Sequence, residues 1–285
     1  MFRIFILSLF SIIFFQSNII YSKIIVIGNL KFIVQMKNNL SLPGCGLFGH
    51  FERISNGQDS IDGSYPFAAL LYRYQAPFGG AVIINERWLL SAAHNFYESK
   101  QPSIYQIGVG SIYLKRLIMK KVDKIIVHEK YQHHQKYDLA LIRLKEPLKF
   151  GQNIRPICLP EYSFESLNDL KRGRAIGWGY RNFSGSKVSE ILQEVDLDII
   201  PLKKCRQIYS KLDQDIIHSQ ICTYTKNKDE CSGDSGGPFF AYKNDQAILF
   251  GIIGFGVTCA DEFPGVNTAV SHFLNWIHRI LMENH

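Results

Sequence analysis

The feature that most constrains the fold of this chain is a succession of short runs rich in Val, Ile, Leu and aromatic residues, each closed by Gly, Pro, Asn or Asp. Runs of this kind predict β-strands. Beyond residue 53 no helical periodicity alternates with them, which favours antiparallel barrels or sandwiches over a parallel sheet. The predicted strands are FAALLYRY, GGAVII, ERWLLSAA, DKIIVHE, DLALIRL, GRAIGWG, EVDLDII, PFFAY, AILFGIIGFG and GVNTAV.

The end of the chain has a different pattern. In SHFLNWIHRILMEN the apolar residues recur at helical spacing, so the sequence predicts an amphipathic helix over about residues 271–283. Its apolar face consists of Phe273, Leu274, Ile277, Ile280 and Leu281. Polar and Pro-containing residues interrupt the strand pattern at LKFGQNIRPICLPEYS, where two packed β domains would be joined.

The first residues are typical of a secretory signal. Arg3 precedes an apolar run from Ile4 to Phe15, and small residues follow it. Because this run is short for a membrane span, we expect a signal peptide over residues 1–22, a secreted, extracellular product and no stable membrane association. Apolar residues resume at 24–27, which leaves an uncleaved membrane anchor as the alternative.

The net charge of +7 is concentrated near the start of the chain. Residues 1–53 hold five of the 32 Lys and Arg but only one of the 25 Asp and Glu, so the remainder carries about +3. The basic stretch LKRLIMKK fits a solvated strand face better than a polyanion site. We therefore expect no nucleic-acid partner.

Cysteines and sequons are the features whose meaning depends on secretion. Six cysteines in a secreted chain predict three disulfides, although sequence alone allows fifteen pairings. None of them has the spacing of a metal site, so we expect no metal and no cofactor. The sequons at Asn39 and Asn182 lie in predicted loops and are candidate glycosylation sites.

The strongest chemical motif is DECSGDSGGPFF, residues 229–240. Glycines around Ser235 let the backbone turn sharply, as a nucleophile on a tight turn requires. The N–H groups of Gly233 and Ser235 can point together at a developing oxyanion. A serine hydroxyl needs a base and an orienting acid, and the candidates are His94 in SAAH and Asp138 in YDLALIRL.

GDSGG also matches GxSxG, the nucleophile elbow of the α/β-hydrolases. In that fold the serine lies between a strand and a helix, and the acid and the histidine follow it. Here only His272, His278 and His285 follow Ser235, and no alternation of strands and helices precedes it. The sequence therefore disfavours the α/β-hydrolase fold for this serine.

The chain resembles the chymotrypsin/trypsin family of serine proteases. SAAH, DLALIRL and GDSGGP occur in the family order, with GWG, ICLP and PGV at the expected intervals, over about residues 45–285. The resemblance implies an all-β fold of two six-stranded antiparallel barrels with a C-terminal helix. Barrel one would cover about residues 54–155 and carry His94 and Asp138, and barrel two about 156–270 and carry Ser235. These three residues would form the catalytic triad.

The resemblance also implies how the cysteines pair. The six cysteines would form Cys45–Cys158, Cys205–Cys222 and Cys231–Cys259. Two further family disulfides are missing, each with both partners absent. One would join the position of Asn95 to that of Phe78 or Gly79, and the other would join Gly173 to Ala241.

FGHFERISNG resembles the activation junction of the family. Cleavage between Arg53 and Ile54 would free an amino group that pairs with Asp234 and orders the oxyanion loop. Residues 23–53 would then be a pro-segment, tethered through Cys45 to the peptidase domain over 54–285. The chain is expected to be a zymogen that needs an activating trypsin-like protease.

In this family the residue at the base of the specificity pocket corresponds to Asp229, and a carboxylate there selects Arg or Lys. Three departures from the family pattern bear on this pocket: Glu230, Asn267, and Gly254 in place of a serine that supports the triad acid. The pocket walls, which complete the expected substrate site, would come from Gly254, Phe255, Gly256 and Gly265.

The resulting expectation is a secreted serine endopeptidase that acts on protein or peptide substrates without a cofactor. We expect it to be a monomer that a protein inhibitor controls. The alternative is a homologue that keeps the fold, has lost turnover and acts as a binding protein. His128, His133 and His134 lie in a loop that we expect to be exposed, with an inhibitory zinc site as the alternative. The loop GVGSIYLKR lacks calcium-binding acids.

Overall fold

The computed structural model describes residues 21–27, 30–36, 41–47, 63–132, 136–160, 170–179, 188–226, 233–256 and 263–284. The chain divides into a unit of residues 41–274 and a unit of residues 1–40 with 275–285. In the latter, β1 (Tyr21–Ile27) pairs antiparallel with β2 (Leu30–Met36). The C-terminal helix α3 spans Leu274–Glu283, which confirms the predicted terminal helix.

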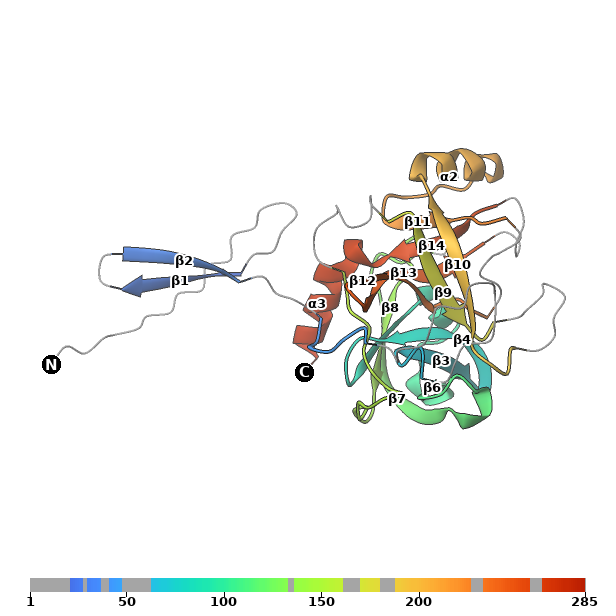
Figure 1. The fold of residues 1–285 in the computed structure, drawn as a ribbon, viewed down its shortest axis with the longest axis horizontal. Coiled ribbons are helices and arrows are strands. Elements are labelled where there is room, and N and C mark those ends of the chain that lie inside the picture. Colours follow the sequence, from blue (N-terminus) through green and yellow to red (C-terminus); the bar gives the residue numbers. More distant parts are fainter. Residues whose placement is uncertain are drawn as a thin grey trace. The chain divides into compact units, whose positions relative to one another are not determined.

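Residues 68–144 contain the first closed six-stranded barrel (Figure 1). Alternate residues of most of its strands belong to one buried cluster, for example Ile107 and Val109, or Ile142 and Leu144. This is the period-two pattern of strands with one face in a core. The order around the barrel is β3 (Ala68–Arg73), β4 (Ala76–Ile83), β5 (Trp88–Ser91), β8 (Ala140–Leu144), β7 (Ile118–Val127) and β6 (Tyr105–Val109).

Residues 172–269 contain the second closed six-stranded barrel (Figure 1). Its core is built around Phe239 and Phe250, with smaller side chains such as Ala175 and Ala269 between them. The predicted all-β fold of two barrels is thus confirmed. The order is β10 (Gln193–Ile200), β11 (Gln220–Thr223), β14 (Gly265–Ala269), β13 (Gln246–Phe255), β12 (Pro238–Lys243) and β9 (Arg172–Gly177).

Two hairpins of these barrels turn on two residues with positive φ. Asn244 (φ 50°) and Asp245 (φ 58°) join β12 to β13, and both residue types tolerate this conformation. Tyr74 (φ 51°) and Gln75 (φ 66°) join β3 to β4 in the same way. Neither of these favours positive φ, so pairing of the flanking strands imposes the turn on them.

The sequence patterns do not predict three elements of this unit: β6, β11 and the helix α2 (Leu202–Tyr209). β11 has only four residues, and α2 follows Pro201 without a side-chain cap. The disulfide Cys205–Cys222 joins α2 to β11, with 6.3 Å between the Cα atoms. A covalent link thus secures two elements whose local sequence signals are weak.

The disulfide Cys45–Cys158 ties the segment before the barrels to residue 158, with 4.9 Å between the Cα atoms. Backbone hydrogen bonds reinforce it, since Gly46 donates to Pro156 and accepts from Ala247. These two disulfides are two of the three pairs that the family resemblance implies. The third, between Cys231 and Cys259, lies outside the described residues.

Candidate active site

His94 and Asp138 come from neighbouring strands of the first barrel. His94 lies in a short 3₁₀ helix, Ala93–Phe96, that begins two residues after β5. Asp138 lies two residues before β8. Since β5 and β8 are antiparallel and Ser91 pairs with Ala140, the end of one strand meets the start of the other. The strand register therefore places the two side chains at the same rim of the barrel.

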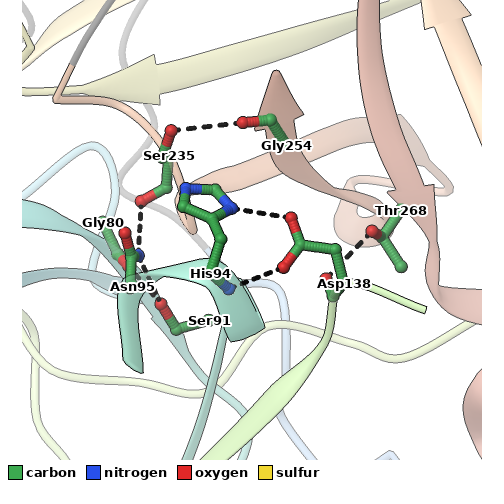
Figure 2. Close-up of polar contacts among 8 residues, drawn as sticks. All are labelled: Gly80, Ser91, His94, Asn95, Asp138, Ser235, Gly254 and Thr268. Atoms are coloured by element: carbon green, nitrogen blue, oxygen red, sulfur yellow. Dashed lines mark hydrogen bonds and ion pairs between the residues drawn. The ribbon is translucent and has the colours of Figure 1, made fainter. Parts of the chain in front are cut away.

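Two hydrogen bonds lock His94 and Asp138 together. The carboxylate Oδ2 of Asp138 lies 2.7 Å from Nδ1 of the imidazole, and Oδ1 accepts from the backbone N–H of His94 at 2.8 Å (Figure 2). Asp138 is only 1% exposed, so these bonds replace the water that its carboxylate loses. A donating Nδ1 leaves Nε2 as the acceptor, which is the tautomer that a general base needs.

The charge of Asp138 also acts on a neighbouring tyrosine. Burial raises the pKa of Tyr131 to about 12, and the carboxylate of Asp138 adds to the rise.

The second barrel also contacts Asp138. The hydroxyl of Thr268 donates to the backbone carbonyl of Asp138 at 3.0 Å. The acid is thus fixed from both barrels.

Ser235 lies on the turn that leads into β12. Gly233 (φ 96°) and Gly236 (φ 90°) flank it in a conformation that favours glycine, and Gly236 donates to the carbonyl of Ile253 at 2.8 Å. The imidazole of His94 lies between Asp138 and Ser235 (Figure 2). The Ser235 hydroxyl donates to the carbonyl of Gly254 at 3.2 Å.

Asp234 occupies a space that glycines on the facing segment leave open. Its Oδ1 accepts from the N–H of Gly179 at 2.7 Å. A Cβ atom built on Gly177 would collide with the same carboxylate. Ile54, the partner that the family resemblance implies for Asp234, lies outside the described residues.

The residues of this site lie within a stretch that matches a known protein family. The family model described as Trypsin matches residues 54–277, which include His94, Asp138 and Ser235. The chain belongs to the trypsin family. The expected family resemblance is therefore confirmed, and with it the fold that places the three residues together.

Similar trypsin-family proteins carry the names of transmembrane proteases. Transmembrane protease serine 11G of Rattus norvegicus is 34% identical over 241 residues, 82% of this chain and 57% of that protein. Transmembrane protease serine 11B of Homo sapiens is 35% identical over 231 residues, 79% and 55% respectively. Transmembrane protease serine 7 of Mus musculus is 33% identical over 247 residues, 83% and 29% respectively. The chain thus spans little more than half the length of the first two relatives and less than a third of the last.

No helix within the described ranges is both long and apolar enough to cross a bilayer. The apolar run Ile4–Phe15, from which a signal peptide is predicted, lies outside those ranges.

The structure places part of the predicted trypsin-family pocket. Gly254 and Phe255 end β13, Gly256 follows them, and Gly265 begins β14. A Cβ atom on Gly254 would lie 2.5 Å from the carbonyl oxygen of Val266, so a serine here requires the backbone to shift. Because Gly254 has no hydroxyl, it adds no side-chain donor to the two bonds that His94 makes with the carboxylate of Asp138.

Other residues of the expected pocket are anchored away from the triad. Phe255 packs edge-on against Tyr209, with 5.9 Å between ring centroids. Asn267 is fully buried and its amide donates to the hydroxyl of Thr223 at 3.2 Å. Asn267 is thus held within the second barrel.

The structure shows what lies at the two places where the family resemblance implies a disulfide that this chain lacks. A Cβ atom on Gly79 would lie 2.9 Å from the amide nitrogen of Asn95, so Gly79, rather than Phe78, faces Asn95. At the other place, a Cβ atom on Gly173 would collide with the ring of Phe239. The amide of Asn95 thus lies against Gly79, and the ring of Phe239 fills the space beside Gly173.

The prediction of an exposed histidine loop is wrong for His128. This side chain is 8% exposed and stacks on Tyr137, with 5.5 Å between ring centroids, and it meets Phe273 edge-on. Its Nδ1 accepts from the N–H of Lys130 at 3.1 Å. Contacts with the rings of Tyr137 and Phe273 bury the imidazole of His128. Among the described residues there is no cluster of three metal-ligating side chains.

Several predicted site residues fall outside the described ranges, so nothing is added to the expectations for them. They are Asn39, Arg53, Ile54, His133, His134, Asn182, Asp229, Glu230, Cys231 and Cys259.

Sequence reasoning did not predict contacts that three residues make with the backbone of Asp138 and Ser235: Gly80, Asn95 and Thr268. Gly80 and Asn95 both donate to the carbonyl of Ser235. Asn95 drew notice only as a departure from the family cysteine. Its partner lies 140 residues away, and no local pattern encodes such a contact.

Proposed function

We propose that this chain is a secreted trypsin-like serine endopeptidase, synthesised as a zymogen and specific for peptide bonds after Arg or Lys. The observation that carries the proposal is the pair of bonds that fixes His94 on the buried Asp138 beside Ser235. This arrangement suits a base that must accept a proton at Nε2 and hold the resulting positive charge.

The reaction proceeds by covalent catalysis. Ser235 rotates its hydroxyl from the carbonyl of Gly254 toward Nε2 of His94, which takes the proton as Oγ attacks the scissile carbonyl. The N–H groups of Gly233 and Ser235 stabilise the oxyanion. His94 then returns the proton to the leaving amine, and water hydrolyses the acyl-enzyme in a second cycle.

Activation and specificity depend on residues that flank this centre. Cleavage after Arg53 by a trypsin-like protease frees the amino group of Ile54, which pairs with Asp234 and orders the oxyanion loop. The disulfide Cys45–Cys158 keeps the pro-segment attached to the cut enzyme. Asp229 selects a basic side chain by ion pairing at the end of the pocket.

Secretion follows from the predicted signal peptide, and the anchored form is the alternative that the names of the relatives bring forward. Expression in a secretory cell decides between them. A soluble product whose N-terminus lies after residue 22 supports secretion, and a product that stays with carbonate-washed membranes supports an anchor. The proposed enzyme is a monomer, is glycosylated at Asn39 and Asn182, and is controlled by a protein inhibitor.

The test of the catalytic proposal is activity before and after trace trypsin, on peptides that end in Arg, Lys, Phe or Ala. Sequencing of the new N-terminus runs in parallel, and the Ser235→Ala chain controls for the added trypsin. Cleavage after Arg or Lys that appears with an Ile54 terminus, and is absent from the control, supports the proposal. A preference for Phe contradicts the role of Asp229.

The second candidate is a binding protein that retains the fold without turnover. Gly254 favours it, because it has no side-chain hydroxyl to donate to Asp138, and its carbonyl accepts the hydrogen bond of the Ser235 hydroxyl. Correct cleavage at Arg53 with no hydrolysis of any peptide, and no labelling of Ser235 by a fluorophosphonate, would select this candidate.

A further inference from the structure

Asn95 follows the proposed catalytic base directly and is almost fully buried, with 3% of its surface exposed. Its side-chain nitrogen donates to the hydroxyl oxygen of Ser91 at 3.2 Å and to the backbone carbonyl of Ser235 at 3.0 Å. A primary amide has two N–H donors, so both are used. One of them reaches from the first barrel to the nucleophile turn of the second.

These bonds belong to a closed circuit of four residues (Figure 2). The hydroxyl of Ser91 donates to the carbonyl of Gly80 at 2.8 Å, and the N–H of Gly80 donates to the carbonyl of Ser235 at 2.8 Å. Asn95 closes the circuit on the same carbonyl. In a buried polar network whose members all have partners, each bond fixes the geometry of the next.

The surrounding backbone fits the size of the Asn95 amide. A Cβ atom on Gly79 would lie 2.9 Å from the amide nitrogen, and one on Gly236 would lie 2.7 Å from it. The reverse orientation of the amide would set its oxygen against the carbonyl oxygen of Ser235. The chemistry of the site therefore requires a donor at this point.

We propose that Asn95 is a positioning residue that holds the Ser235 backbone in register with His94. The inference rests on the proposed role of Ser235 as nucleophile. A disulfide between positions 79 and 95 would lie wholly within the first barrel. The Asn95 amide instead links the two barrels and acts on the residue that carries the reacting hydroxyl. A small displacement of that residue is costly, because attack needs an aligned hydroxyl.

The first test compares Asn95→Ala with Asn85→Ala, in activated enzyme normalised by active-site titration. Asn85 is a matched control because its side chain accepts from the N–H groups of Arg87 and Trp88, in a turn of the same barrel. We expect Asn95→Ala to lower kcat about tenfold with KM within about twofold, because the pocket is untouched. Asn85→Ala should lower Tm and leave kcat unchanged.

Asn95→Asp is a second variant that keeps the side-chain volume and removes both donors. It should lose at least as much kcat as Asn95→Ala. If both variants retain the wild-type kcat per titrated site, the positioning role is overturned.

A second measurement needs no turnover. In chains that carry Ser235→Ala the backbone carbonyl of residue 235 is retained, so hydrogen exchange at the Gly80 N–H reports on the circuit. Adding Asn95→Ala should speed this exchange about tenfold, and adding Asn85→Ala should not. Unchanged exchange overturns the Asn95 link. Faster exchange together with a wild-type enzyme that hydrolyses nothing supports the link and overturns the proposed function alone.

Discussion

At the two places where the family resemblance implies a disulfide that this chain lacks, opposite kinds of interaction fill the space. At Gly79 and Asn95, beside the proposed nucleophile Ser235, a polar side chain completes a hydrogen-bonded circuit. At Gly173 and Ala241, on the paired strands β9 and β12, the ring of Phe239 fills the space instead. Hydrogen bonds therefore occupy the first place, and apolar packing occupies the second.

The difference follows from what each place borders. The first borders the carbonyl of Ser235, a buried acceptor that gains from a donor. The second lies in the core cluster of the second barrel, where Ala241 and Phe239 are buried and apolar contact is the available gain. We therefore expect changes at the first place to alter catalysis and changes at the second to alter stability.

Phe239→Ala should have the largest effect on stability. The ring is fully buried, so its removal should lower the free energy of unfolding by about 3–5 kcal/mol. Urea titration measures this loss, and active-site titration of the folded fraction measures kcat. A drop in kcat beyond about twofold would break the comparison, because the second place would then also act on catalysis.

Restoring the first disulfide, by Gly79→Cys with Asn95→Cys, should separate stability from catalysis. Closing a loop of this length should make the oxidised variant about 3 kcal/mol more stable than its reduced form. Its kcat should stay below wild type, because Ser235 loses a donor and a Cβ on Gly79 lies 2.9 Å from its carbonyl oxygen. Melting with and without reductant gives the first quantity and titrated kinetics the second. A wild-type kcat in the oxidised variant would mean that a covalent link replaces Asn95 fully.

Gly173→Ala should destabilise by overpacking. Its Cβ would collide with Phe239, which is confined in the core, so we expect a loss of about 1–3 kcal/mol. In a Phe239→Ala background this loss should disappear, whereas in a Phe250→Ala background it should persist. Phe250 is the matched control because it lies in the same cluster. A double-mutant cycle measures the coupling, and equal losses in both backgrounds would contradict the packing explanation.

Sequence reasoning succeeded where the chemistry is carried by contiguous motifs. SAAH, DLALIRL and GDSGG each point to one member of the proposed triad. The register of β5 and β8 then places His94 beside Asp138, and Ser235 reaches them from the second barrel. Sequence reasoning failed where a residue acts through a distant partner. Asn95 and Phe239 could each be named as unusual or apolar, but not as replacements for disulfides. Their partners are set by how the barrels close.

β6 and α2 escape prediction from the sequence for a local reason. β6 contains Gly108, whose missing side chain makes room for Leu117, and the glycine interrupts the strand pattern. α2 is short and carries three basic residues in LKKCRQIY. The prediction for His128 is wrong for the opposite reason. The residues that follow it are mostly polar, which predicts exposure, but contacts with the rings of Tyr137 and Phe273 bury it.

Tyr65→Phe should have the smallest effect and tests whether polar bonds also contribute near the second place. The Tyr65 hydroxyl donates to Glu194 at 2.6 Å and accepts from Arg174 at 2.9 Å, beside Gly173. Burial foremost raises the pKa of Tyr65, so the hydroxyl keeps its proton across the working pH range. Arg174 retains its ion pairs with Glu194 and Asp196 when the hydroxyl is removed.

Loss of this one hydroxyl should therefore lower the free energy of unfolding by about 1 kcal/mol, with kcat unchanged. Tyr72→Phe, which removes a half-buried hydroxyl from β3, is the control for the substitution itself. A loss of 3 kcal/mol or more, about the value set for Phe239→Ala, would mean that the polar cluster rather than the ring replaces the second disulfide. The contrast between a polar and an apolar replacement would then fail at the second place, while the link between Asn95 and Ser235 would be untouched.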